Sequence, residues 1–294
     1  MLSVFAYGRG NYSYISRDRE WQQTTSFFGK AALAYTLLME AMTRESVTEF
    51  PVVIVRPDLK RFEFFRRGER QAGVWVVRQG PLYFTLPITT GTKPGVADYL
   101  PAPHGLAGIA APVEQVYPSL TPFIELSDGR VLVAGDGADE IEAAPDGSSL
   151  RAVWRRWVVA GGRSGQLVDP HITSEVIWHV NGTTLTREET LLSSEAITLR
   201  RWWVALPMTA ARSEVDYEQG QRLYSFKGDG VIVKIAVTAD WPLNVSLAAT
   251  GNSALGRGAR GPVPLHLIYE SNDLRLAPSN RARWRITINV EGKK

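Results

Sequence analysis

The spacing of the hydrophobic positions changes near residue 50. Across residues 24–43, apolar side chains recur three to four positions apart, a spacing typical of a helix. Hydroxyl side chains at the start of this segment are suitable N-terminal caps. Apolar residues such as Phe27 and Leu33 also lie on the other sides, and a helix that is apolar nearly all round needs neighbours on several faces. We therefore expect residues 1–48 to be a helical remnant of a domain that lies upstream.

From Pro51 onward, strand-like segments alternate with turn residues. The segments combine β-branched and aromatic residues with alternating apolar and polar positions, and Gly, Pro, Asn and Asp divide them. This pattern predicts a mainly β fold in which residues 49–294 form a large antiparallel β-sandwich, preceded by a short N-terminal helical segment. The predicted strands are residues 52–56, 60–67, 73–78, 81–88, 121–126, 130–134, 150–160, 173–180, 183–192, 196–206, 222–227, 230–238, 243–249, 265–270 and 282–290.

The dipeptide Asn181-Gly182 lies between two predicted strands and is the preferred centre of a type I′ hairpin turn. A turn of these two residues would place Glu175 opposite Glu188 on one face, beside His179, with the apolar face in the core. Directly opposed carboxylates repel each other unless a cation lies between them. The Arg-rich strands nearby can supply that cation, and a metal or acid–base site that includes His179 is the alternative.

Composition narrows the class of protein. The chain has 294 residues, 44% of them hydrophobic and 21% charged, as in an ordinary soluble globular protein. Cysteine is absent, which excludes disulfides, thiolate metal sites and cysteine nucleophiles. A net charge of +3 without a concentrated basic stripe argues against nucleic acid as a partner. The longest apolar run, 27–42, contains Lys30 and falls short of the ~20 residues of a membrane span, so we expect no membrane partner.

The densest polar and aromatic cluster precedes the predicted helix. Guanidinium groups pair with carboxylate or sulfate, amides donate neutral hydrogen bonds, and aromatic rings stack on sugar faces. The cluster therefore suits a cleft that binds an acidic sugar; a surface loop with packed rings and paired charges is the alternative. Its candidate residues are Arg9, Asn11, Tyr12, Tyr14, Arg17, Arg19 and Trp21.

Two long loops stand out, residues 89–119 and 250–264. Loops of this length in a compact β domain are usually functional or disordered. The first carries Asp98, Tyr99 and His104, and the two prolines before His104 would hold it in one place. Histidine titrates near neutrality, so His104 is a candidate acid, base or ligand contact. A solvated loop histidine is the alternative.

Tryptophan and arginine are concentrated in residues 151–159 and 199–206 and fall on both faces of these predicted strands. We expect one Trp of each strand in the core and the other covered by Arg through a cation–π contact, with a sugar-binding platform as the alternative. His171 follows Asp169-Pro170 in a turn that could bind metal, but no two histidines have the spacing of a metal motif. The sequence therefore predicts neither a metal nor a cofactor, and nucleotide-binding and hydrolase motifs are absent.

Three segments together carry a resemblance to a known family: YGRGNYSYISRDREW near the start, then DYLPAPHG, then DPHITSEVIWHVNGTTLTREETL. They resemble the C-terminal half of bacterial heparinase II/III-type polysaccharide lyases. Those enzymes join an (α/α) toroid to a β supersandwich and cleave uronic-acid polysaccharides by β-elimination. The resemblance implies a supersandwich-like fold, an acidic polysaccharide or oligosaccharide as substrate, an upstream toroid, and a periplasmic or extracellular location.

The resemblance also implies residue roles. The cleft would lie between toroid and sandwich, with residues 7–21 and 89–119 as walls, His104 and Tyr14 catalytic, and the remaining cluster residues, Asp98 and Tyr99 binding substrate. Family sandwiches often hold a structural zinc through His and Asp, and no such cluster can be matched here. Two other functions remain open. One is a non-catalytic carbohydrate-binding or assembly sandwich with Trp202 or Trp203 exposed; the other is a glycoside hydrolase or mutarotase-like sandwich, which needs paired carboxylates in one cleft.

Overall fold

A computed structural model of the chain describes residues 35–36, 39–40, 57–66, 68, 71–91, 102–109, 120–135, 137–160, 168–208, 214–218, 223–228, 230–249, 265–278 and 280–292. The chain separates into two compact units, Met1–Pro57 and Asp58–Lys294. Residues 35–36 and 39–40 are helical, but the rest of the predicted helix 24–43 lies outside the described residues and stays a prediction. Among the residues described, no helix is long and apolar enough to cross a membrane.

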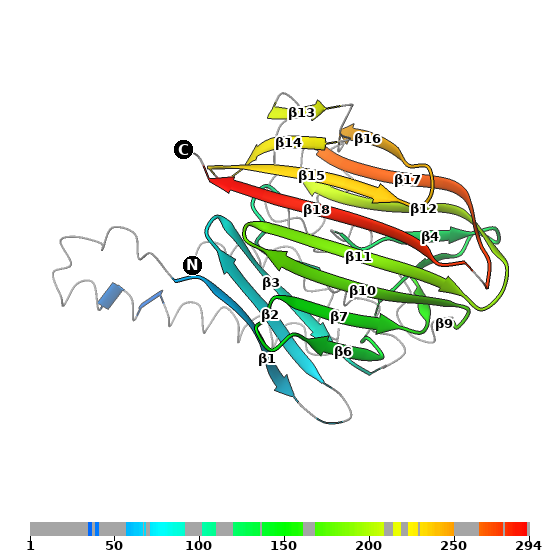
Figure 1. The fold of residues 1–294 in the computed structure, drawn as a ribbon, viewed down its shortest axis with the longest axis horizontal. Coiled ribbons are helices and arrows are strands. Elements are labelled where there is room, and N and C mark those ends of the chain that lie inside the picture. Colours follow the sequence, from blue (N-terminus) through cyan, green and yellow to red (C-terminus); the bar gives the residue numbers. More distant parts are fainter. Residues whose placement is uncertain are drawn as a thin grey trace. The chain divides into compact units, whose positions relative to one another are not determined.

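The second unit consists of antiparallel strands in three sheets, which confirms the predicted mainly β class (Figure 1). The three-stranded sheet has the order β1-β2-β3, with bounds Leu59–Arg66, Ala72–Gln79 and Leu82–Thr89. The eight-stranded sheet has the order β13-β14-β15-β18-β11-β10-β7-β6, with bounds Val215–Glu218, Leu223–Gly228, Val231–Ala239, Ala282–Gly292, Thr184–Ser193, Ile172–Asn181, Ser149–Trp154 and Glu140–Ala143. The seven-stranded sheet has the order β16-β17-β12-β4-β5-β8-β9, with bounds Asn244–Ala249, Leu265–Leu276, Ile197–Met208, Phe123–Leu126, Val131–Val133, Trp157–Val159 and Val168–Asp169.

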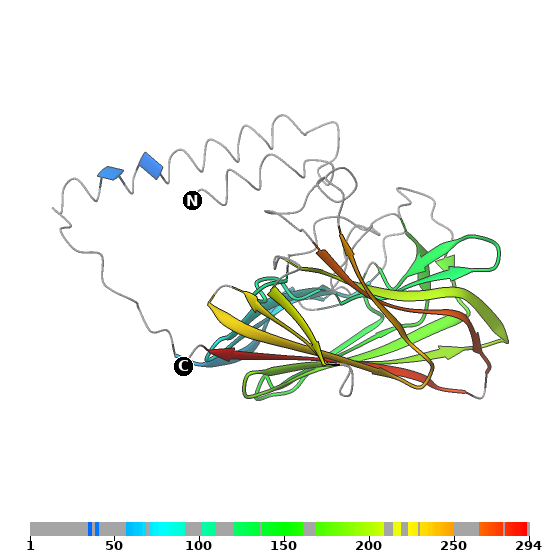
Figure 2. The same ribbon diagram turned by 90° about the horizontal axis from the view of Figure 1, so that it is seen from above.

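The two larger sheets lie in two layers and share one core (Figure 2). Burial alternates strictly along β10 and β11, because successive side chains of a strand point to opposite faces. Trp178 and Trp284 of the eight-stranded sheet enter the same cluster as Trp202 and Tyr269 of the seven-stranded sheet. The three-stranded sheet joins that cluster through residues such as Trp75. The predicted antiparallel sandwich is therefore confirmed.

Tryptophan builds the core rather than the surface. Every described Trp except Trp203 is buried. Trp203 stacks on Phe123, with ring centroids 5.4 Å apart, and the guanidinium of Arg201 lies 4.7 Å from its ring centroid. This is the predicted pairing of one core Trp with one Arg-covered Trp for residues 199–206; for residues 151–159 the prediction is wrong, because Trp154 and Trp157 are both core residues. Trp202 is fully buried and does not fit an exposed sugar platform.

The single strand predicted over residues 150–160 is wrong. Trp154 and Trp157 are both buried, although residues three apart on a straight strand face opposite sides. The chain bends at Arg155 and Arg156, both held by Asp139: the Arg155 amide donates to its carboxylate at 2.6 Å, and Arg156 forms an ion pair at 3.1 Å. The segment therefore crosses from the eight-stranded sheet as β7 to the seven-stranded sheet as β8. The short strands β6, β9 and β13 were not predicted.

The predicted hairpin exists, but its register is shifted by one residue at the turn. Asn181 pairs with Thr184, so the loop is Gly182-Thr183 rather than Asn181-Gly182. Gly182 has a φ of +54° at the first loop position, which is the glycine-favouring position of a type II′ turn. The shift places Glu175 opposite Thr190 and Glu188 opposite Ile177, so the two carboxylates are not directly opposed.

A buried ion pair lies between the sheets on the inner face of β11. The side chains of Arg187 and Glu189 are 3% and 0% exposed, and their Nη1 and Oε2 atoms are 2.8 Å apart. Glu189 also accepts hydrogen bonds from Ser174 Oγ at 2.5 Å and from Trp284 Nε1 at 2.7 Å. The Arg187 guanidinium lies between the Trp178 and Trp284 rings, 5.6 and 4.7 Å from their centroids. Burial lowers the pKa of Arg187, and Glu189 opposes that shift.

Candidate functional site

Most of the predicted site residues lie outside the residues that the structure describes. Their roles in binding acidic sugar, and the catalytic role of Tyr14, therefore stay predictions. This holds for Arg9, Asn11, Tyr12, Tyr14, Arg17, Arg19, Trp21, Asp98 and Tyr99.

His104 is described, and its main chain is fixed on both sides. Its N–H donates to the Thr85 carbonyl at 2.7 Å, and its own carbonyl accepts the Thr85 N–H at 2.8 Å. This bridge extends the free side of β3, the edge strand of the three-stranded sheet. Five residues further on, Ile109 bridges to Met208 at the end of β12. The segment Ala102–Ile109 is therefore held at two points, which agrees with the expectation that His104 stays in one place.

Tyr83 is a neighbour of His104 that the sequence interpretation missed. Burial alternates along β3, so Tyr83 and Thr85 both point outward, and Tyr83 is 46% exposed. Residues that exchange both main-chain hydrogen bonds carry their side chains on the same face, which places the His104 side chain on the face of Thr85 and Tyr83. The Tyr83 ring lies against Gly105, whose φ is +94°: a Cβ built there would be 3.1 Å from Tyr83 Cε1. The side chains of His104 and Tyr83 therefore point to the same face of this sheet edge.

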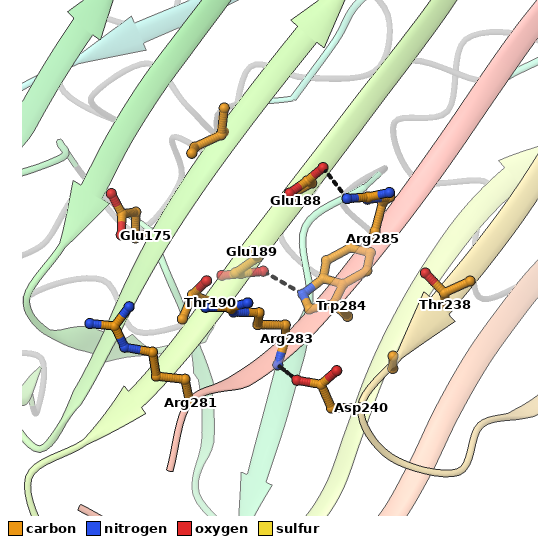
Figure 3. Close-up of a pocket in the computed structure, with 12 residues that line it drawn as sticks. Glu175, Glu188, Glu189, Thr190, Thr238, Asp240, Arg281, Arg283, Trp284 and Arg285 are labelled. Carbon is orange, nitrogen blue, oxygen red and sulfur yellow. Dashed lines mark hydrogen bonds and ion pairs between the residues drawn. The ribbon is translucent and has the colours of Figure 1, made fainter. Parts of the chain in front are cut away.

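A separate pocket of about 440 Å³ lies on the outer face of the eight-stranded sheet. Strand β18 runs through its middle, between β15 and β11, and Trp284 and Glu189 of the buried network form part of its lining (Figure 3). The lining residues are Glu175, Ile177, Glu188, Glu189, Thr190, Thr238, Ala239, Asp240, Arg281, Arg283, Trp284 and Arg285.

Glu175 and Glu188, the two pocket carboxylates predicted to face each other, are each bound by an arginine, as the sequence predicts. Glu188 Oε1 lies 2.6 Å from Arg285 Nη2, and Glu175 Oε1 accepts a hydrogen bond from Arg151 Nε at 2.5 Å. Arg151 comes from a predicted Arg-rich strand, whereas Arg285 comes from β18, which was not considered as the source. The hydrogen bond to Glu175 is the main cause that raises the pKa of Arg151. These contacts favour the structural interpretation over an acid–base site with His179, which does not line the pocket.

Metal sites are not supported in the described part of the chain. There, no three His, Asp or Glu side chains gather in a way that could hold a metal ion. Asp169 instead accepts the His171 amide at 3.0 Å and lies 3.6 Å from Arg130, and His171 Nδ1 lies 3.1 Å from Ser194 Oγ. The described residues therefore do not fit the structural zinc that the family resemblance implies.

Comparison with known proteins gives distant structural neighbours only. No family model and no curated protein matches the sequence. A crystal structure of heparinase III matches with a TM-score of 0.48 and 10% identity, over 81% of this chain and 38% of that chain. Heparan sulfate lyase from Pedobacter heparinus matches with a TM-score of 0.43 and 8% identity, over 90% and 41%. A polysaccharide lyase matches with a TM-score of 0.42 and 10% identity, over 78% and 34%. The chain thus spans about two fifths or less of the length of these proteins.

Proposed function

We propose that this chain is the β-sandwich part of a glycan-active, polysaccharide-lyase-like protein that acts on uronic-acid-containing polysaccharides by β-elimination. The hypothesis comes from the resemblance in the sequence. The observation that supports it is the main-chain pairing of His104 with Thr85, an arrangement that puts the His104 side chain on the same face as the exposed Tyr83.

β-Elimination needs two proton transfers at one sugar. A base removes the proton at C5, next to the uronate carboxyl group, and the C5–H electron pair becomes the C4–C5 double bond as the C4–O bond breaks. The departing oxygen takes a proton from an acid. A neutral imidazole can accept the first proton and a phenol can donate the second, and such positioned groups contribute typically ~10²–10⁴-fold in rate.

The proposed roles divide between described and undescribed residues. His104 acts as base or acid, with Tyr83 or Tyr14 as its counterpart. The arginines near the start of the chain neutralise the uronate carboxylate, since a guanidinium binds a carboxylate in a bidentate geometry. That neutralisation stabilises the charge that builds up on the carboxyl group as the C5 proton leaves.

The test uses the protein expressed from its full reading frame and a panel of uronate polymers. Appearance of the unsaturated product raises ultraviolet absorbance. We expect His104→Ala to lower kcat by about 100-fold or more. His179→Ala, which removes an exposed imidazole on the outer face of β10, should leave kcat within about twofold of the parent. The proposal fails if no uronate polymer yields unsaturated product, or if His104→Ala leaves kcat unchanged.

A second candidate, a glycoside hydrolase or mutarotase-like sandwich, is favoured by one observation. Glu175 and Glu188 line the same pocket, as that function requires. Both carboxylates are engaged by arginines, which suits a structural role better than proton transfer. Release of reducing ends without unsaturated product, lost in Glu175→Gln, would support this candidate over the lyase. Glycan binding without either product, and without faster interconversion of sugar anomers, would instead indicate a non-catalytic carbohydrate-binding sandwich.

A further inference from the structure

The pocket on the eight-stranded sheet contains two cross-strand rows of outward side chains. In the first row, Thr238 of β15 pairs with Arg285 of β18, which pairs with Glu188 of β11. In the second row, the Arg283 main chain exchanges hydrogen bonds with Asp240, and Arg283 pairs with Thr190 of β11. The first row lies within the ladder of all three strands, whereas Asp240 of the second row lies just beyond the end of β15.

The arginine of the first row is ion-paired across the strands, whereas in the second row Asp240 accepts the main-chain amide of Arg283. Arg285 faces Glu188 across the strand and forms an ion pair with it. Arg283 faces the neutral Thr190, and the next carboxylate in its row, Glu175, is bound by Arg151.

Arg281 and Arg283 also line the pocket and have no carboxylate partner among the described residues. Within the described part of the chain, neither of their side chains forms an ion pair or a hydrogen bond. Both are exposed, and both extend across β11 toward Thr190 and Glu175, away from Asp240 (Figure 3). Two adjacent guanidinium groups that point into one pocket form a binding site for an oxyanion.

We propose that this pocket is a second saccharide site, separate from the His104 surface, which holds a sugar-borne anion between Arg281 and Arg283. The anion is a uronate carboxylate or a sulfate ester. The Thr190 hydroxyl and the free lone pairs of Glu175 hydrogen-bond to hydroxyl groups of the same sugar. The ligand class rests on the proposed function, since it is the acidic glycan on which the protein would act.

Two further features favour a sugar over other anionic ligands. The pocket also presents Glu175, Glu188 and Asp240, so a densely charged polyphosphate would be repelled, whereas one anion surrounded by hydroxyl groups finds both donors and acceptors. The volume of about 440 Å³ lies in the range typical of small-ligand pockets.

The base of the pocket is rigid. Trp284 neighbours Arg283 and Arg285 in β18, and its indole N–H is bonded to the buried Glu189 of β11 at 2.7 Å. This bond ties together the two strands that present Arg283 and Thr190, and a site supported in this way is preorganised.

The test is calorimetric titration of the full chain with tetragalacturonate, sulfated cellotetraose, unmodified cellotetraose and sodium sulfate. We expect one or both anionic tetrasaccharides to bind, and cellotetraose not to bind. Arg283→Ala and Arg281→Ala should each weaken binding about tenfold, because each removes a charge-assisted hydrogen bond. Arg275→Ala, which removes an exposed arginine of β17 in the other sheet, is the matched control for net charge and should change Kd less than twofold.

Each outcome decides the proposal. If neither anionic tetrasaccharide binds, or if Arg275→Ala weakens binding as much as Arg283→Ala does, the pocket is not a saccharide site. If sodium sulfate binds as tightly as the sulfated sugar, it is an anion site without sugar recognition, and the proposal is also wrong. The direct titration does not depend on turnover, so an inactive protein that binds through Arg281 and Arg283 overturns the lyase proposal and leaves this site standing. Conversely, turnover that depends on His104, with no effect of Arg283→Ala on binding, overturns only this site.

Discussion

Glu188 and Glu189 are neighbours on β11, yet they point to opposite faces of the sheet and form different kinds of ion pair. The side chains of Glu189 and Arg187 are almost completely buried, whereas those of Glu188 and Arg285 are 47% and 55% exposed. The distances are similar, 2.8 Å inside and 2.6 Å outside. Contact geometry therefore does not separate the two pairs; their access to water does.

This difference in exposure to water determines how much each pair contributes to stability. Water solvates an exposed charge whether or not its partner is present, so an exposed pair adds about 0–1 kcal/mol. Water cannot solvate a buried charge in this way. Arg187 and Glu189 therefore depend on each other, and Glu189 depends also on its hydrogen bonds from Ser174 and Trp284. The inner pair therefore ties β10, β11 and β18 together, whereas the outer pair contributes little to stability.

The largest expected effect comes from breaking the inner pair. Glu189→Ala leaves the Arg187 guanidinium buried without its counter-ion and leaves the Trp284 indole N–H without an acceptor. We expect the free energy of unfolding to fall by about 3–5 kcal/mol, measured by urea denaturation. A loss below about 1 kcal/mol would show that water reaches the guanidinium, and the contrast between the two faces would not hold.

The matched control removes both inner charges. In Arg187→Met with Glu189→Leu, no buried charge is left unpaired, and apolar groups fill the space. This double variant should recover most of the stability lost in Glu189→Ala, because the replacement of a whole buried pair is often neutral or stabilising. A double variant as unstable as Glu189→Ala would assign the loss to packing around Trp178 and Trp284 instead of charge.

A buried histidine extends the comparison between the buried and the exposed ion pair. His266 of β17 is 3% exposed, and burial lowers its pKa below the ordinary value of 6.5. The unfolded chain then binds a proton more readily than the folded chain. Its contribution to the free energy of unfolding is therefore complete above a pH of about 6.5 and is lost as the pH falls toward the lowered pKa.

His266→Gln should flatten the dependence of the urea midpoint on pH between about 5 and 7. Stability at neutral pH can change in this variant for packing reasons, so the slope is the quantity to measure. His171→Gln, in which an exposed imidazole is replaced, is the control and should keep the parent slope. An unchanged slope in His266→Gln would mean that the buried imidazole does not control the acid response.

The smallest effect belongs to the outer pair. Glu188→Ala and Arg285→Ala should each lower the free energy of unfolding by about 0.2–1 kcal/mol, and a double-mutant cycle should give a coupling of similar size that weakens at high salt. Coupling above about 2 kcal/mol would show that the outer pair resembles the inner one.

Much of the fold follows from local pattern. Alternation placed β2, β3, β10, β11, β15 and β18 within one or two residues of their bounds, because each has one face in the core and one toward solvent. Local pattern failed at one crossing between sheets and at one hairpin turn. The bend at Arg155 and Arg156 depends on Asp139, which lies outside the predicted strand, and the turn at Gly182 depends on which of two adjacent residues takes a positive φ.

Less of the candidate sites than of the fold could be predicted from the sequence. His104 is a candidate because of its residue type and its prolines, but the position of Tyr83 on the same face becomes visible only once Thr85 and His104 pair across 19 residues of chain. Similarly, the alternation of Arg281, Arg283 and Arg285 is plain in the sequence. That Thr190 faces Arg283 while Glu188 faces Arg285 depends on the position of β18 between β11 and β15.

That position has a consequence for how the protein is made. During synthesis, β10–β11 and β14–β15 leave the ribosome long before Ala282–Gly292, the strand that separates the two hairpins in the finished sheet. Until it arrives, β11 and β15 each present an unpaired edge, and such edges attract other chains. Until β18 pairs with both edges, the nascent sheet is open along the line where the pocket will form, and a chain truncated before residue 282 should aggregate rather than fold with one strand fewer.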